Sequence, residues 1–197
     1  MYVKHYSRCS LVREIVVVWN KGVPPNLSDL DFAVLVMIRT CDDVERGFNV
    51  WRQHPDCIVG FYPRLIDGGR LKYGEKYVRK HNEYNMILTG AAFIDSQLAF
   101  KSYWSEERKQ GREMVDKLFN CEDVLLNYLY ANTSSSLRIV EYVKPAWAID
   151  TSKFSGVAIS QNTQGHYGLR SSCLMKFSEM YGSLTGHRWG FDSRKDS

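Results

Sequence analysis

Apolar residues along this chain gather into short unbroken runs that are rich in β-branched and aromatic side chains. Runs of this kind are typical of strands that are buried on both faces of a parallel sheet. They are Glu14–Trp19, Phe32–Ile38, Ile58–Pro63, Asn85–Phe93 and Arg138–Val143. The run at 85–93 ends in small residues, Gly90 and Ala91 among them, where either a ligand or another backbone could approach closely.

Helical spacing of apolar residues alternates with these runs. One helix is expected to open at Thr40 and end before Pro55, a polar helix covers Ser105–Phe119, and a last helix carries Leu174, Phe177 and Tyr181. The segment Ser152–Leu169, rich in serine, glycine and asparagine, is predicted to be a long loop. This alternation predicts an α/β sheet sandwich, formed as a single domain over residues 1–197.

Two places in this framework could carry chemistry. Asn20 follows the first strand at its carboxyl end, the edge of an open α/β sheet where ligands bind. The stretch 120–130 places a cysteine and the acids Glu122 and Asp123 ahead of helically spaced apolar residues, and it predicts a helix with one buried face that Asn120 can cap. The helix dipole alone also favours acids in a first turn, so helix stability and catalysis explain these two acids about equally well.

Composition excludes several classes of protein. With 44% apolar and 13% aromatic residues in 197, the chain can bury one sizeable core. The net charge of +4 comes from interspersed acids and bases without a basic stripe, so no nucleic-acid partner is expected. No apolar run is long enough to span a membrane and the N-terminus lacks the apolar region of a signal peptide, so a soluble polypeptide is expected.

The cysteines and glycosylation sequons add little about compartment or metals. The five cysteines have no spacing typical of a zinc site. Sequons at Asn26 and Asn132 are compatible with a secretory lumen, but such triplets often arise by chance.

Five separated segments resemble a known family. They are IVVVWN at 15–20, IVGFYP at 58–63, NMILTGAAF at 85–93, NCED at 120–123 and HYGLRSSCLMKF at 166–177. Their order and their sequences resemble those of glycosyltransferase family 64, the exostosin-type enzymes, over nearly the whole chain. The sequences are most similar to plant members that move glucosamine or N-acetylglucosamine onto glycosyl inositol phosphorylceramide. A plant mannosyltransferase that acts on the same lipid class is a near relative.

The resemblance implies a retaining transfer from a UDP-sugar by a GT-A, Rossmann-like domain that uses Mn²⁺ in the Golgi lumen, with a membrane anchor in full-length relatives. It implies that Asp123 lies at the sugar and acceptor side of the site and that Arg170 lies by the diphosphate. A fixed guanidinium can meet the negative charge of a departing diphosphate, and a carboxylate can orient an acceptor hydroxyl. On the sequence alone, an exposed loop arginine is the simpler explanation of Arg170.

A disulfide between Cys121 and Cys173 is also implied, because members of the family pair these cysteines. The bridge would clamp the helix of Asp123 to the loop of Arg170. Two buried free thiols are the alternative. The candidates for substrate binding are Asn20, Gly90, Ala91 and Glu122.

The chain departs from the family pattern between Arg39 and Thr40. The family has a further segment there, with a strand and the DXD-type acidic triplet that holds Mn²⁺, so the domain is interrupted at this point and is truncated at its N-terminus. Asp42 and Asp43 are better explained as first-turn acids of a helix than as replacement metal ligands. The expected sheet is therefore incomplete, and two functions stay open: a transferase domain, or a catalytically inactive variant that only binds or has no function.

Overall fold

The computed structural model describes residues 37–38, 41–67, 72–134, 138–146, 148–149, 163–184 and 189–190. The expected strand Glu14–Trp19, Asn20 and the sequon at Asn26 lie outside the described residues. The helices are α2 (Cys41–Gln53), α3 (Glu75–His81), α4 (Ser96–Tyr103), α5 (Lys109–Leu118), α6 (Glu122–Thr133) and α7 (Thr163–Tyr181), with short 3-10 turns η2 (Thr89–Ala91) and η3 (Glu106–Arg108). The strands are β1 (Met37–Ile38), β2 (Ile58–Gly60), β3 (Pro63–Asp67), β4 (Lys72–Gly74), β5 (Glu83–Tyr84), β6 (Met86–Ile87), β7 (Ala92–Phe93), β8 (Val140–Tyr142), β9 (Ala148–Ile149) and β10 (Trp189–Gly190).

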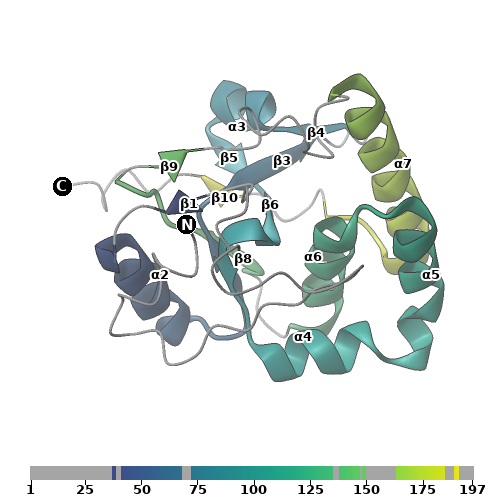
Figure 1. Cartoon of the computed structure of the whole chain (residues 1–197), viewed down its shortest axis with the longest axis horizontal. Coiled ribbons are helices and arrows are strands. Elements are labelled where there is room, and N and C mark those ends of the chain that lie inside the picture. Colours follow the sequence, from purple (N-terminus) through teal and green to yellow (C-terminus); the bar gives the residue numbers. More distant parts are fainter. Residues whose placement is uncertain are drawn as a thin grey trace, which may run out of the picture.

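These strands form several small sheets, with α4, α5, α6 and α7 gathered on one side of the molecule and α2 on the other (Figure 1). In one sheet β2 lies between β7 and β8, antiparallel to the first and parallel to the second. In another, β3 lies between β4 and β6 and is antiparallel to both. The remaining described pairs, β1 with β9 and β5 with β10, are antiparallel as well.

The predicted mixture of helices and strands is confirmed, but the described strands do not form the continuous parallel sheet that the unbroken apolar runs suggested. The run at 58–63 is divided between β2 and β3, and the run at 85–93 is interrupted by η2. Asp67 at the end of β3 faces Lys72 at the start of β4, so a short connection joins them, and such a connection can join only antiparallel strands.

Several short elements were not predicted. They are α3, α4, β4, β5, β9 and β10. For α4 a local signal was present, because the Asp95 carboxylate accepts the N–H of Leu98 at 2.7 Å and so caps the helix. None of the helices in the described part of the chain is both long and apolar enough to cross a lipid bilayer.

The helix expected after Thr40 is confirmed as α2, and the predicted inward residues cover a small separate core. Val44 and Trp51 pack against a cluster built on β2. Phe48 stacks on Trp51 with ring centroids 5.9 Å apart and also contacts Phe93 of β7. This packing holds α2 against the β7–β2–β8 sheet.

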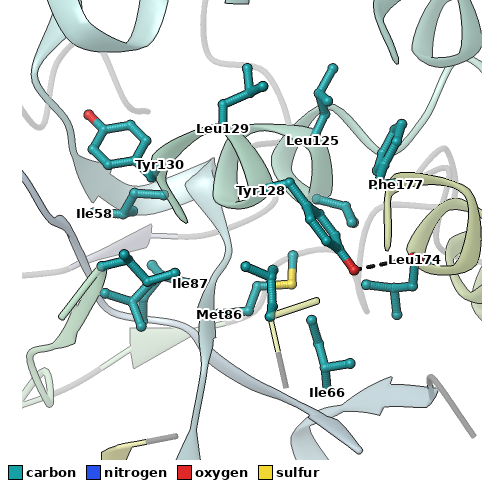
Figure 2. Close-up of a cluster of buried hydrophobic side chains, with 14 of the residues drawn as sticks. Ile58, Ile66, Met86, Ile87, Leu125, Tyr128, Leu129, Tyr130, Leu174 and Phe177 are labelled. Carbon is teal, nitrogen blue, oxygen red and sulfur yellow. Dashed lines mark hydrogen bonds between the residues drawn. The ribbon is translucent and has the colours of Figure 1, made fainter. Parts of the chain in front are cut away.

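Helix α6 lies at the centre of the main core, against α4, α5, α7 and β6. Figure 2 shows strand residues such as Ile58 and Ile87 facing it from one side and Phe177 of α7 from another. The residues predicted to be buried, Val124, Leu125, Tyr128 and Leu129, are each at most 1% exposed. Asn127 and Tyr130 are fully buried too, so α6 is enclosed around most of its circumference rather than along one face.

Two buried tyrosines on α6 attach it to neighbouring helices through their hydroxyls. The Tyr128 hydroxyl donates to the carbonyl of Leu174 at 3.2 Å (Figure 2). The Tyr130 hydroxyl donates to the carbonyl of Asp95 and accepts the N–H of the same residue. Burial raises the pKa of both tyrosines to about 12, so these hydroxyls remain protonated and able to donate at any physiological pH.

A pair of glycines tests this packing. A Cβ at Gly60 would lie 2.5 Å from Cγ2 of Ile87 and 2.9 Å from the carbonyl oxygen of Ala91, whereas a Cβ at Gly90 meets nothing within 4 Å. We expect Gly60→Ala to lower the free energy of unfolding by about 1 to 3 kcal/mol, as overpacking does. Gly90→Ala should leave it unchanged or raise it by at most about 1 kcal/mol. Urea denaturation measures both, and equal effects would contradict the packing of β2 against β6 and η2.

Candidate active site

The turn between α5 and α6 fixes the backbone of the candidate site. Phe119 and Cys121 both adopt left-handed conformations, with φ of 50° and 77°. Asn120 lies between them and does not cap α6 as expected, because Cys121 is the residue that precedes the first helical turn. The Asn120 amide oxygen instead accepts the N–H of Cys121 at 2.8 Å and an N–H of Arg170 at 3.1 Å.

A disulfide joins this turn to α7. Cys121 and Cys173 are bonded, with their Cα atoms 6.5 Å apart, within the range of native disulfides. Both cysteines are fully buried. The bridge links two segments that are 52 residues apart in the chain, and it does so one turn of α7 from Arg170.

Asp123 and Arg170 form a buried ion pair beside this bridge. A terminal nitrogen of the guanidinium binds Oδ2 of Asp123, and both residues are less than a tenth exposed. The other carboxylate oxygen of Asp123 accepts the backbone N–H of Val124 at 2.8 Å. Since a carboxylate offers about four acceptor positions, Asp123 has capacity for a further donor.

The structure corrects the expected setting of Arg170. The sequence placed it at the end of a long loop, but α7 begins at Thr163, so Arg170 lies in the second turn of a helix. It is also buried rather than an exposed loop residue. Its guanidinium reaches across to Asp123 and Asn120, a contact between two predicted site residues that their separate roles in the sequence analysis did not anticipate.

Glu122 stands next to this pair, in the first turn of α6 and at the surface. Its pKa is raised above the ordinary value, first by partial burial and then by the negative charge of Asp123, while Arg170 acts in the opposite direction. The carboxyl of Glu122 is therefore close enough to Asp123 and Arg170 for both of their charges to act on its pKa.

Asn127 connects the Asp123 helix to the strand that leads to the small residues, and the sequence analysis missed it. Its side chain pairs with both backbone groups of Ile87 in β6, accepting the N–H at 3.1 Å and donating to the carbonyl at 2.9 Å. It also donates to the carbonyl of Asp123 at 2.8 Å. The turn η2, with Gly90 exposed and Ala91 partly buried, begins two residues after Ile87. A polar residue inside the otherwise apolar face of α6 was the signal that could have identified Asn127.

Asp42 and Asp43 do not fit a metal site. The Asp43 carboxylate is 2% exposed and accepts bonds from Arg46 at 2.8 Å and from the backbone N–H of Ala146 at 2.9 Å, while Asp42 is exposed. Asp43 therefore ties α2 to the segment after β8, which is a structural role. Within the described ranges, no three or more histidine, cysteine, aspartate or glutamate side chains gather into a group that could hold a metal ion.

The sequon at Asn132 also has a structural role. Its amide nitrogen donates to the carbonyl of Tyr128 at 2.9 Å and to the carbonyl of Tyr181 at 2.8 Å. The residue lies in the last turn of α6, where it joins the ends of α6 and α7.

The disulfide gives a prediction about stability and thiol chemistry. In the chain-entropy picture, closing a loop of this length stabilises the folded state by about 4 kcal/mol, so reduction should lower the free energy of unfolding by about that amount. Cys57 is the internal control, since it is buried, donates to the carbonyl of Arg138, and has a pKa raised to about 12 by burial and by nearby acids. Iodoacetamide should label Cys57 only after unfolding, and peptide mapping under non-reducing conditions should recover Cys121 joined to Cys173. Recovery of both as free thiols would contradict the bridge.

The chain matches known proteins in two ways, through a family model and through individual relatives. The family model of the glycosyl transferase family 64 domain matches residues 35–194. Glucosamine inositolphosphorylceramide transferase 1 of Arabidopsis thaliana is 53% identical over 228 residues, which cover 100% of this chain and 30% of that protein, and the protein of the same name from Oryza sativa subsp. japonica matches to the same extent. Exostosin-2 of Homo sapiens is 30% identical over 156 residues, covering 76% of this chain and 20% of its own length.

The extent of these matches shows how much of its relatives' length the chain covers and to which family it belongs. This chain spans about 30% of the length of the plant transferases. Their alignment has 228 positions and covers all 197 residues here, so at 31 positions, the difference between the two, the relative has residues that this chain lacks. Because the family model covers most of the chain and includes the Asp123–Arg170 pair and the disulfide, this chain belongs to glycosyl transferase family 64.

Proposed function

We propose that this chain is a glycosyltransferase domain that moves glucosamine or N-acetylglucosamine from a UDP-sugar to a glycosyl inositol phosphorylceramide sphingolipid. The observation that carries the proposal is the buried Asp123–Arg170 pair, which the disulfide holds between two helices in a chain whose plant relatives are named for this transfer. A retaining mechanism and a GT-A, Rossmann-like fold belong to the same proposal and rest on membership of the family.

Asp123 is the proposed catalytic residue at the acceptor side. Its carboxylate is fixed by the N–H of Val124 and by Arg170, and its remaining acceptor capacity suits an acceptor hydroxyl. A carboxylate in that position orients the hydroxyl, and it also stabilises the positive charge that develops on the transferred sugar ring. Both effects require a carboxylate that is already in position. Because folding orders the side chain of Asp123, no further reorganisation is needed during the reaction.

Arg170 then acts mainly as a positioning residue for Asp123. Two of its terminal nitrogens reach Asp123 and Asn120, a planar arrangement that a lysine could not reproduce. The diphosphate contact implied by the family resemblance would have to share the same guanidinium. Asn20, Gly90, Ala91 and Glu122 complete the proposed substrate site, and Glu122 is supported by its raised pKa beside Asp123.

Mn²⁺ is expected for the family, where it would neutralise the diphosphate as a Lewis acid. The described acids do not fit it, because Asp43 is engaged by Arg46 and Ala146 and no larger group of ligands forms. We therefore assign no step to a metal in this chain. The Golgi lumen is the proposed location, and the Cys121–Cys173 bridge supports it, since disulfides persist in oxidising compartments.

A second candidate is a catalytically inactive variant that binds the acceptor without transferring sugar to it. Two observations favour it: the structural engagement of Asp43, and the 31 alignment positions at which the plant transferase has residues that this chain lacks. We place the missing segment between Arg39 and Thr40, where the domain is interrupted. Sequencing the transcript across this junction tests whether the interruption is natural.

A transferase assay separates the two candidates. We expect the 197-residue chain, supplied with UDP-sugar, acceptor lipid and Mn²⁺, to turn over at least about 10³-fold more slowly than a version carrying the segment of the plant relative. The reason is that a Lewis acid at the diphosphate is worth several kcal/mol, and each 1.36 kcal/mol is a factor of ten. Equal rates for the two versions would show that another group has replaced the metal site.

Substitutions in the restored version test the ion pair. Asp123→Asn should lower kcat by about 10² to 10³ with donor KM nearly unchanged, because it deletes the charge and keeps the shape. Arg170→Lys should also lower kcat, since a point charge cannot hold both Asp123 and Asn120. The exposed Lys176–Glu179 pair, which lies on α7 as Arg170 does, is the matched control. Glu179→Gln should leave kcat unchanged and should alter the free energy of unfolding by no more than about 1 kcal/mol. Rates within a few-fold of the parent for both site variants, with folding intact, would remove them from the mechanism.

A further inference from the structure

Phe119 is a residue whose identity neither the backbone nor the core explains. It is 75% exposed, more than the other large apolar side chains noted as exposed in the described part of the chain, which are Phe100, Trp104 and Met175. Its φ of 50° and ψ of 40° place it in the left-handed region at the end of α5. Glycine or asparagine suits that conformation far better, because a bulky side chain there is strained.

Both local requirements therefore favour a different amino acid. A helix end in the left-handed conformation favours glycine, and an exposed position favours a polar side chain. Burial of the ring does not compensate for the strain, since three quarters of the residue is exposed to solvent. Strain that the folded protein does not offset by its own contacts points to a contact made with something outside the chain.

The ring is exposed but its attachment is fixed. Its backbone N–H bonds to the carbonyl of Val115, and the next residue, Asn120, bonds to Arg170 and to Cys121. Cys121 is in turn held by the disulfide. A ligand that contacts Phe119 would therefore meet a backbone that is already ordered, and this lowers the entropic cost of binding.

The chemistry next to Phe119 suits a sugar ring. Glu122 and Asp123 follow within one helical turn, and their carboxylates accept bonds from hydroxyl groups. A sugar ring offers hydroxyl donors at its edge and an apolar C–H face that packs on an aromatic side chain, the combination of apolar lining and few polar groups found in ligand sites. The same acids make this surface unsuited to the anionic surface of a membrane.

We propose that Phe119 is a specificity-determining contact on which a sugar ring of the acceptor packs, in the turn that leads into the helix of Asp123. This inference rests on the proposed function, because it takes the acceptor to be the glycosyl headgroup of an inositol phosphorylceramide. It adds a binding residue that lies outside the ion pair and is not needed to hold the fold together.

The test compares binding and stability in the 197-residue chain. The probe is the glycosyl inositol phosphate headgroup freed of its ceramide, measured by isothermal titration calorimetry, and the variants are Phe119→Gly, Phe119→Tyr and the control Phe100→Ala on α4. We expect Phe119→Gly to weaken binding about five- to tenfold, the size of an aromatic packing contact. It should also raise Tm by about 2 to 4 °C, since the strain is relieved. Phe119→Tyr, which keeps the ring, and Phe100→Ala should bind as the parent does.

Each other outcome has a definite meaning. If the parent binds the headgroup and Phe119→Gly binds it equally well, the role of Phe119 is wrong while the proposed acceptor stands. If the parent does not bind the headgroup, the proposed acceptor and the role of Phe119 both fail. If Phe119→Gly binds the headgroup normally but loses the complete lipid in phosphatidylcholine vesicles, the ring contacts the bilayer and the sugar contact is wrong. A fall in Tm for Phe119→Gly would mean that the ring supports the fold instead.

Discussion

Asp123 and Arg170 bring opposite charges into the interior where α6 meets α7, and the surrounding structure is arranged to hold them there. Taking each charge out of water costs several kcal/mol, and the attraction between them commonly does no more than balance that cost. Two apolar residues would stabilise the same contact at least as well. The pair is therefore better explained by a need for a charge at a fixed position than by a need for stability, and the loss of either partner would leave an uncompensated buried ion.

Such a position requires rigid support, and the neighbouring elements supply it. Asp123 lies in the first turn of α6, at the centre of the main core, and Arg170 lies in α7 one turn before the bridged Cys173. Asn127 extends the support to β6, since it bonds to Ile87 and to the carbonyl of Asp123. The carboxylate is thus held by two helices, a strand and a covalent bridge, which is how precise sites are kept within a fraction of an ångström. This arrangement requires backbone strain in the turn before α6, where Phe119 and Cys121 adopt left-handed conformations.

Sequence reasoning succeeded where a single local pattern determines the outcome. The buried positions of α6 and α2 followed from helical spacing, and the disulfide followed from the family resemblance. It failed where the outcome depends on distant parts of the chain. The contact between Asp123 and Arg170 joins residues 47 apart, and each had a sufficient local explanation of its own, as a first-turn acid or a loop arginine. The apolar runs could not reveal that β6 and β7 are separated by a turn, because periodicity reports burial and not chain direction.

The two candidate functions share the proposed acceptor side of the site and differ only in its metal side. The reason lies in the contacts that the described residues make. The proposed acceptor side, with Asp123, Asn120 and the disulfide, is supported by α5, α6, α7 and β6, which lie far along the chain from the proposed junction at 39 and 40. The proposed metal side, in contrast, lies close to this junction in the chain. Asp43 is a buried carboxylate, and releasing it to a metal would take from it the two donors that now compensate its burial, the N–H of Ala146 and the guanidinium of Arg46. An interruption at 39 and 40 would therefore remove donor chemistry while leaving the acceptor side in place. That asymmetry makes binding without transfer physically consistent with the same fold.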